Sequence, residues 1–411
     1  MHPIDPPAAA HYNRPMRNTL LTMAAAAVLG GLFTGLAPAQ APAGAKGKAP
    51  GAAKGKGKGG PAAPAQPGFK VNPDRTVTFT LRAADATTVT VGGDFGATTP
   101  MTKGADGSWT ATVGPLRPAI YNYNFTVNGA RVLDPGNPWL GTADRNPGSA
   151  LLEVRGETAA VWDPQPVPRG TLHIHYYNSK SFDNALRMVY VYTPPGYESS
   201  NARYPALYLM HGAGGSESSW FTAGRANIIL DNLIAQGKAK PMVVVMPYGR
   251  AGTSTTIDPF GPPPGPQGNP IFPNDVVPDV VPFVEKAYRL IANADNRAIA
   301  GLSMGGNQTL HIGLNNLDKF HAIGAFSPVI MNASAEQDYA KAFADVAGMN
   351  RNLKLFYIYC GVDDTLFESN KIFHALLDGK KIKHTFVETK EAHVWRNWRD
   401  YLADFAPRLF Q

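Results

Sequence analysis

The sequence is nearly devoid of cysteine, because Cys360 is the only one among 411 residues. An intrachain disulfide is therefore excluded, and the stability of the fold must come from burial of apolar side chains. An apolar fraction of 44%, with 10% aromatic residues, makes a sizeable core available. The chain also exceeds the usual length of one domain, which favours two folded units.

The part of the chain expected to fold also lacks an excess of charge. The formal net charge is +7, but residues 1–68 hold seven of the 38 basic residues and only one of the 31 acidic residues. The remaining positions carry 31 basic and 30 acidic residues. A basic face for phosphate groups is not indicated, so nucleic acid is not expected as a partner.

Residues 1–41 have the order of a secretory signal peptide: a short basic flank, an apolar stretch and then small residues, with cleavage expected near Ala39 or Ala41. The start is left open between Met1 and Met16. An uncleaved membrane anchor is the alternative, because the apolar stretch approaches spanning length. No cysteine follows the leader to support a lipoprotein anchor. The expected location is secreted or periplasmic, without stable membrane insertion after cleavage.

Residues 42–68 are almost wholly alanine, glycine, proline and lysine. This composition cannot bury enough apolar surface to offset the entropy of ordering, so the segment is expected to be a disordered linker.

Residues 69–157 change to short alternating runs, with turns such as Asp106-Gly107 and Asn128-Gly129 between them. This spacing predicts a small all-β sandwich. The expected strands are Thr76–Leu81, Thr87–Val91, Ser108–Val113 and Tyr121–Val127.

The stretch Trp109–Pro135, with Tyr121, Tyr123 and Phe125, resembles the early-set immunoglobulin-like modules that precede many esterases. The resemblance implies an immunoglobulin-like sandwich. Trp109 and the tyrosines could form a platform on which sugar rings stack, so carbohydrate is a candidate partner of this module. Alternating aromatic side chains more often fill the core of a sandwich.

Residues 158–411 alternate between strand and helix patterns. Repeated crossovers of this kind predict an α/β domain with a mostly parallel sheet covered on both faces. The expected strands are Leu186–Thr193, Tyr204–His211, Pro241–Pro247, Arg297–Ala300, Phe320–Ser327, Leu353–Cys360 and Lys383–Glu388, and the expected helices are Arg225–Gln236, Val276–Tyr288, one from Gly305, one that includes Phe373–Asp378, and Trp395–Phe410.

The run Gly301-Leu302-Ser303-Met304-Gly305 fits a nucleophile elbow. A serine on a sharp strand-to-helix turn projects from the backbone, so its close neighbours must be small. The run follows the apolar residues Ala298-Ile299-Ala300 and opens an expected helix. Ser303 is therefore the candidate nucleophile; the alternative is an ordinary serine in a turn that tolerates glycine.

A serine hydroxyl needs a base to accept its proton, and position selects His393 among ten histidines. It lies between the last expected strand and the closing helix, where α/β-hydrolases carry the base. His384 lies inside a strand and His374 inside a helix, where structural roles are expected. The acid should follow the preceding strand, and Asp363 and Asp364 both lie there.

An oxyanion hole needs backbone N–H groups aimed at the developing negative charge. Met304, next to the nucleophile, is one candidate donor. The second should lie in His211-Gly212-Ala213-Gly214-Gly215, a loop like the His-Gly-rich loop of esterases, and Ala213 is the candidate there. His211 is expected to brace this loop and not to transfer protons.

Several motifs together resemble the feruloyl esterases of carbohydrate esterase family one, within the wider putative-esterase group that includes S-formylglutathione hydrolase, mycolyltransferases and enterochelin esterases. The resemblance extends from Gly170 to the C-terminus. It implies an α/β-hydrolase fold, a triad of Ser303, Asp364 and His393, and oxyanion donors Ala213 and Met304, with neither a metal nor an organic cofactor required. The motifs are His211–Trp220, Arg225-Ala226-Asn227, Ala300–Gly306, Asn316–Phe320 and Cys360–Asp364.

Two departures from the family pattern bear on the substrate. The Gly/Pro-rich loop Gly249–Asn274 is longer than expected where the substrate should bind, and the family's glycine-rich lead into the histidine is here Lys390-Glu391-Ala392. Phe260 and Phe272 could line a binding site for an aromatic acid, or they could simply pack against the rest of the protein. The candidate substrate contacts are His211, Gly212, Phe260, Phe272 and Trp395.

The expected reaction is acyl transfer from Ser303 to water. The expected substrate is a small-molecule or polysaccharide-linked ester, first of all a feruloyl or acetyl ester on xylan. The alternatives are an enterochelin-type triester and acyl transfer to a carbohydrate acceptor. A carbohydrate-binding protein with a relic hydrolase domain is the non-enzymatic alternative.

Overall fold

The computed structural model describes residues 66–141, 148–254, 257 and 275–411. The predicted signal peptide, nearly all of the predicted linker, and both Phe260 and Phe272 lie outside the described residues. Among the described residues, no helix is long and apolar enough to cross a lipid bilayer.

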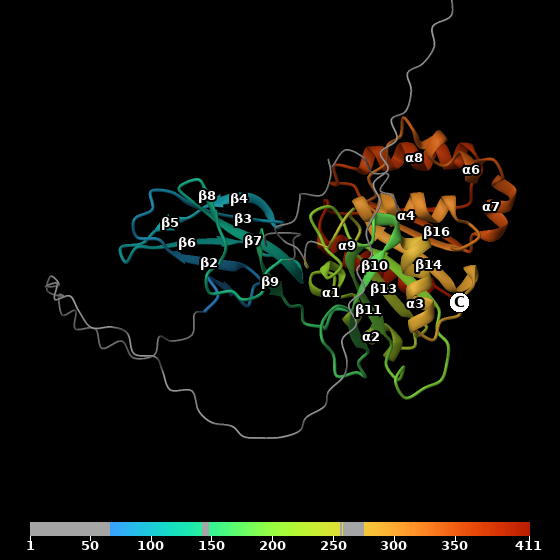
Figure 1. Ribbon diagram of the computed structural model, residues 1–411. Helices are drawn as coiled ribbons and strands as arrows, with labels where there is room; N and C mark the ends of the chain where they lie inside the picture. The colour runs from blue at the N-terminus through green and yellow to red at the C-terminus, as the bar shows by residue number, and fades with distance from the viewer. Residues whose placement is uncertain (1–65, 142–147, 255–256, 258–274) are drawn as a thin grey trace, which may run out of the picture. The chain divides into compact units, whose positions relative to one another are not determined.

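The N-terminal β-region consists of two antiparallel sheets (Figure 1). One sheet has the order β1-β2-β6-β5, and the other has the order β4-β3-β7-β8 with β9 paired to β7. The strands are β1 (Phe69–Val71), β2 (Val77–Arg82), β3 (Val89–Gly93), β4 (Gly96–Pro100), β5 (Thr102–Lys103), β6 (Ser108–Val113), β7 (Ala119–Val127), β8 (Ala130–Val132) and β9 (Ala150–Val154).

The two sheets of the N-terminal β-region share one hydrophobic core. Alternate residues of β2, such as Val77 and Phe79, are fully buried, as the period of two in a strand requires. Trp109, Tyr121 and Tyr123 are at most 7% exposed and belong to the same core. These rings therefore fill the sandwich, and the sugar-stacking platform considered for them is not present.

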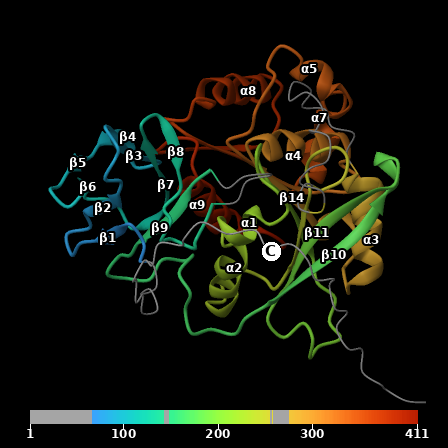
Figure 2. The same cartoon turned by 60° about the vertical axis from the view of Figure 1, so that its left-hand side comes forward.

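The α/β domain is built on an eight-stranded sheet of order β10-β11-β13-β12-β14-β15-β16-β17. The pairs from β13 to β17 are parallel, whereas β10 and β11 pair antiparallel at one edge beside helix α3 (Figure 2). The predicted mostly parallel sheet is thus confirmed. The strands are β10 (Thr171–Ser179), β11 (Ala185–Thr193), β12 (Ala206–Met210), β13 (Val243–Pro247), β14 (Arg297–Leu302), β15 (Ala322–Phe326), β16 (Leu355–Gly361) and β17 (Thr385–Thr389).

Helices cover both faces of this sheet because its central strands are almost wholly apolar. Tyr208 and Val245 face one core, which α3, α4, α7 and α8 complete, whereas Leu207 and Val244 face a second core completed by α2 and α9. The helices are α1 (Ser219–Thr222), α2 (Ala226–Ala235), α3 (Val281–Ala287), α4 (Met304–Asn315), α5 (Ala335–Asp338), α6 (Ala340–Phe343), α7 (Val346–Asn352), α8 (Phe367–Gly379) and α9 (Trp395–Phe405).

The structure contains several elements that were not predicted and differs from two predicted helices. The elements that were not predicted are strands β1, β4, β5, β8, β9 and β10 and the short helices α1 and α5 to α7. The predicted helix Val276–Tyr288 begins with five residues of π-helix, Val276–Val280, before α3. The closing helix α9 ends at Phe405, and a 3-10 turn follows it.

Candidate active site

The three predicted triad residues follow three parallel strands at the same edge of the sheet. Ser303 directly follows β14, Asp364 lies three residues after β16, and His393 lies four residues after β17. Because β14, β16 and β17 run parallel, their carboxyl ends meet at one edge, which is where ligands bind in open α/β sheets.

Ser303 occupies a strained backbone conformation between β14 and α4, with φ 54° and ψ −116°. The glycines around it leave no room for a side chain. A Cβ atom on Gly301 would lie 2.6 Å from the Gly305 carbonyl oxygen, and one on Gly305 would lie 2.4 Å from the His211 carbonyl oxygen. The turn is therefore tight enough to demand both glycines of the motif, as a nucleophile elbow does.

Main-chain hydrogen bonds fix the elbow against the neighbouring strand. The Ser303 N–H donates to the Phe326 carbonyl over 2.9 Å, and the Ser303 carbonyl accepts from Val329 over 3.2 Å and from Asn307 over 3.0 Å. The serine backbone is thus held from both sides, which orients its half-buried side chain.

Asp364 and His393 form a hydrogen-bonded pair. The His393 Nδ1 donates to Asp364 Oδ2 over 2.8 Å, and the Leu366 N–H donates to Asp364 Oδ1 over 2.9 Å. Burial raises the pKa of Asp364, but the hydrogen bonds from His393 and Leu366 outweigh burial and lower it overall. Asp363 is exposed, so the environment distinguishes the two neighbouring carboxylates that the residue pattern left open.

His211 is buried and holds two loops together. Its Nε2 accepts from the Gly249 N–H over 2.9 Å, so Nδ1 carries the proton that is donated to the Gly212 carbonyl over 2.8 Å. Both ring nitrogens thus have main-chain partners. The arrangement fits the expected bracing role and leaves no ring nitrogen for a substrate.

The loop that His211 braces lies against the nucleophile elbow. A Cβ atom on Gly212 would lie 3.3 Å from the Cβ of Ser303. Ala213 is exposed beside it, and Met304 is the first residue of α4, where the N–H has no acceptor within the helix. Both predicted oxyanion donors therefore lie on segments that meet at Ser303.

Trp395, a candidate substrate contact, begins α9 and is half-buried. Its ring meets those of Trp220 and Trp398 edge-on, with centroids 5.3 and 5.2 Å away. Trp398 in turn packs against His393, at 4.9 Å between ring centroids. The tryptophans therefore support the imidazole from the side of α9.

The residue pattern gave no indication of a buried ion pair between β11 and Asp275. Arg187 and Asp275 pair over 2.8 Å, and both side chains are almost fully buried. The guanidinium also donates to the carbonyls of Tyr248, Arg250 and Gly252. Arg187 lies on β11, 88 positions before Asp275, so only the folded sheet brings the pair together.

One cluster of metal-ligating side chains lies away from the elbow, among the residues that the structure describes. His374, Asp378 and His384 each offer a ligand atom, and these atoms lie within 4.8 Å of one another. His374 and Asp378 belong to α8, and His384 precedes β17.

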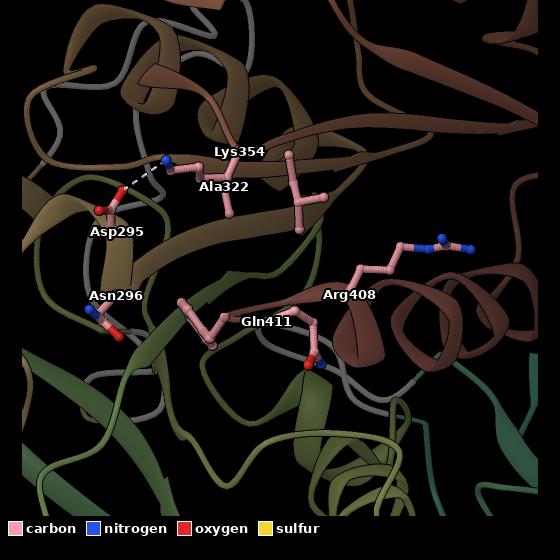
Figure 3. Close-up of a pocket in the computed structure, with 8 residues that line it drawn as sticks. Asp295, Asn296, Ala322, Lys354, Arg408 and Gln411 are labelled. Carbon is pink, nitrogen blue, oxygen red and sulfur yellow. Dashed lines mark ion pairs between the residues drawn. The ribbon is translucent and has the colours of Figure 1, made fainter. Parts of the chain in front are cut away.

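A cavity of about 490 Å³ lies at the amino ends of the parallel strands, opposite the carboxyl ends that carry the candidate triad (Figure 3). Its walls include Asp295, Ala322 and Lys354, which lie at the starts of β14, β15 and β16. Lys354 and Asp295 face each other there over 4.0 Å. The cavity is thus at the amino ends of the strands, away from the candidate triad.

The mixed sheet, the strained serine after β14 and the Asp–His pair at the same edge define an α/β-hydrolase. The chain belongs to the putative esterase family, whose model matches residues 179–409.

The chain is similar to an endo-1,4-beta-xylanase/feruloyl esterase of Xylanibacter ruminicola, with 31% identity over 359 residues. The match covers 84% of this chain and 47% of that protein, so the chain spans less than half of the relative's length.

Two solved structures share the fold. The feruloyl esterase module of Clostridium thermocellum has a TM-score of 0.51 at 23% identity and covers 63% of this chain and 94% of that chain. The enterochelin esterase of Shigella flexneri has a TM-score of 0.64 at 16% identity and covers 84% of this chain and 96% of that chain. Residues 158–411 make up less than two thirds of this chain, whereas the match to the enterochelin esterase covers 84% of it. The fold similarity to that esterase therefore extends into the N-terminal β-region.

Proposed function

We propose that the chain is a secreted serine esterase that removes feruloyl or acetyl groups from plant cell-wall polysaccharide. The observation that carries the proposal is the hydrogen bond between His393 and the buried Asp364, at the edge of the sheet where Ser303 is held in a strained turn. Membership of the putative esterase family and the similarity to a xylanase/feruloyl esterase support the substrate class.

The proposed reaction has two acyl-transfer steps. Ser303 Oγ attacks the ester carbonyl carbon while His393 Nε2, the ring nitrogen not bonded to Asp364, accepts the hydroxyl proton. The oxyanion rests on the N–H groups of Ala213 and Met304, each of which contributes about 3 kcal/mol. The alcohol leaves with the proton from His393, and water then attacks the acyl-enzyme by the same route.

Asp364 stabilises the imidazolium that forms in both steps. Its lowered pKa keeps the carboxylate ionised at neutral pH, so that a negative charge faces Nδ1 whenever Nε2 takes a proton. The carboxylate also holds the imidazole in the tautomer that leaves Nε2 free to act as a base.

The proposed organisation is a signal peptide at 1–41, a linker at 42–68, an early-set immunoglobulin-like module at 69–157 and the esterase domain at 158–411. The two-sheet core of the N-terminal β-region supports the third part.

An enterochelin-type triester is the second candidate substrate, because the fold similarity to the enterochelin esterase extends over both the N-terminal β-region and the α/β domain.

The test uses purified protein with methyl ferulate, acetylated xylan and a triscatecholate triester of the enterobactin type. We expect hydrolysis of the feruloyl or acetyl substrate, and we expect Ser303→Ala to lower kcat by about 10⁶ without changing the circular dichroism spectrum. Ser199→Ala, at an exposed serine in another loop, is the control and should retain full activity.

Activity confined to the triester would contradict the polysaccharide substrate and favour a siderophore esterase instead. Full activity in Ser303→Ala would remove the serine mechanism altogether. Product analysis with and without an added sugar acceptor separates hydrolysis from acyl transfer.

A further inference from the structure

The loop that carries His393 contains a residue in an unfavourable backbone conformation. Glu391, two positions before His393, has φ 79°. The left-handed region costs a residue with a Cβ atom roughly 1–2 kcal/mol relative to the right-handed one. Such strain persists where surrounding contacts over-determine the conformation, so the contacts of Glu391 are informative.

Two arginines from different parts of the chain hold the Glu391 carboxylate. Arg117, between β6 and β7 of the N-terminal β-region, donates from Nε to Glu391 Oε1. Arg396, in α9, donates from Nε to Oε2 over 2.6 Å. Burial raises the pKa of Glu391, but the two arginines outweigh burial and lower it, so the ion pairs are in place at neutral pH.

Arg396 itself is fixed by the N-terminal β-region. Its Nη1 lies 3.0 Å from Asp94 Oδ1, and its guanidinium lies over the ring of Tyr121 at 4.5 Å from the centroid. Asp94, between β3 and β4, is in turn held by the N–H and the side-chain amide of Asn122. Both oxygens of the Glu391 carboxylate are thus connected to the N-terminal β-region, one directly by Arg117 and the other through Arg396.

The other side of the Glu391 loop rests on the strand that leads to Asp364. A Cβ atom on Gly361, at the end of β16, would lie 2.0 Å from the Glu391 carbonyl oxygen. The Asn397 amide also donates to the Ala392 carbonyl over 3.0 Å. A shift of Glu391 must therefore pass along a short, tightly held segment to His393.

We propose that the N-terminal β-region positions the catalytic histidine, and that Arg117 is the positioning residue that acts through Glu391. The inference rests on the proposed function, because it assigns His393 the role of base. As a positioning residue, Arg117 would act on the base through Glu391, so its removal should lower the rate of the chemical step and leave substrate binding nearly unchanged. Displacement of a catalytic group by about 1 Å can cost about 100-fold in rate.

The experiment compares Arg117→Met, Arg117→Lys, Glu391→Gln and the double variant Arg117→Met/Glu391→Gln in the full chain. We expect kcat to fall about 10- to 100-fold in Arg117→Met with KM changed less than twofold. Lysine should restore most of the lost rate because it keeps the charge. The double variant should be no slower than the slower single variant, since both remove the same contact. Arg155→Met removes another arginine of the N-terminal β-region, 72% exposed, and is the control.

Hydrogen exchange of the peptide that contains residues 389–396 provides a readout that needs no substrate. Arg117→Met should speed exchange in this peptide, and Arg155→Met should not. Unchanged exchange and kcat in Arg117→Met, or a change in KM alone, would overturn the positioning role. If the wild-type protein hydrolyses no ester, the proposed function fails, while the exchange measurement still decides whether Arg117 fixes the loop.

His374, Asp378 and His384 bring three potential metal-ligand atoms within 4.8 Å of one another. His384 Nδ1 donates to the Ile382 carbonyl over 2.8 Å, which leaves its Nε2 with a lone pair. That Nε2 lies 2.7 Å from His374 Nδ1 and 4.0 Å from Asp378 Oδ1. Two atoms bound to one zinc ion at about 2.0–2.1 Å lie roughly 3.3 Å apart, so small side-chain movements would admit an ion.

We infer that these three side chains form a binding site for a divalent transition metal such as Zn²⁺. His384 is held by the Ile382 carbonyl, as ligating imidazoles usually are by an outer partner. The His374 proton that now faces His384 moves to Nε2, which lies 3.5 Å from Asp378 Oδ2, so no co-reactant is needed. The ion would join the end of α8 to the start of β17.

Calorimetric titration of the full chain with Zn²⁺ tests this site without any measurement of activity. We expect one ion per chain, with affinity lowered at least tenfold by His374→Gln and by Asp378→Asn, because each removes one of three ligands. Asp378 is 62% exposed, so its replacement should leave the fold intact. His321→Gln, which breaks a His–Asp pair that lacks a second imidazole, is the control. Equal zinc affinity in the wild type and all three variants, or no binding to the wild type at 100 μM zinc, would overturn the proposed site.

Discussion

Two neighbouring carboxylates after β16 show how environment assigns different roles to the same residue type. The side chain of Asp364 is completely buried, accepts hydrogen bonds from His393 and the Leu366 N–H, and has a lowered pKa. Asp363 points to solvent. Only the first can stabilise a positive charge on the imidazole in a setting where water does not screen it.

We predict that Asp364→Asn lowers kcat by about 10³–10⁴, because the amide cannot stabilise the imidazolium or fix the productive tautomer. Asp363→Asn should remain within twofold of the wild-type rate, and steady-state kinetics on one ester measure both. The pKa of Asp364 is lower in the folded protein than in the unfolded chain. Its carboxylate therefore contributes to the free energy of unfolding at neutral pH, and this contribution is lost as pH falls through the folded pKa. Equal losses in the two variants would contradict the assignment.

At the same scale, the sequence allowed Ser303 and His393 to be predicted but left the acid open between two adjacent residues. Spacing relative to a strand identifies a loop, but it does not say which of two neighbouring side chains turns inward. The Arg117–Glu391 pair could not be predicted from the sequence, because its members are 274 positions apart and nothing in the segment that leads into His393 indicates a partner for Glu391.

Among the elements, the strands of the parallel sheet were the most predictable. All five residues of β13 are buried and apolar, and the buried residues of β14 are uncharged after Arg297; such runs are typical of strands covered on both faces. Their order in the chain then placed the three loops of the candidate site at one edge.

Elements with a weak or short pattern were missed. Strand β10 is an edge strand with only two buried residues among nine, so its alternation is obscured. Helices α5 and α6 have four residues each, too few to display a helical period or to form without tertiary contacts. Buried Tyr339, which packs against Phe343 and Phe373, supplies such contacts.

At the scale of the molecule, one buried arginine of α9 joins the α/β domain to the N-terminal β-region. Arg399 is 1% exposed and donates to the carbonyls of Ala223 and Ile120, each over 2.7 Å. Ala223 follows α1, and Ile120 lies in β7. Burial lowers the pKa of Arg399 to about 9, which still leaves the guanidinium charged at neutral pH. Removal of Arg399 would leave two carbonyl oxygens buried without their donors.

We predict that Arg399→Met lowers the free energy of unfolding by about 3 kcal/mol, since each hydrogen bond to a charged group contributes about 1.5–3 kcal/mol and methionine recovers part of the packing. Urea unfolding followed by tryptophan fluorescence measures the change. Arg408→Met is the matched control, because Arg408 pairs at the surface with Asp404 one helical turn away, and its loss should cost under about 0.5 kcal/mol. If both variants unfold at the same urea concentration as the wild type, the buried bridge does not stabilise the junction, and the N-terminal β-region must be held by its other contacts, such as Arg225 with Glu153.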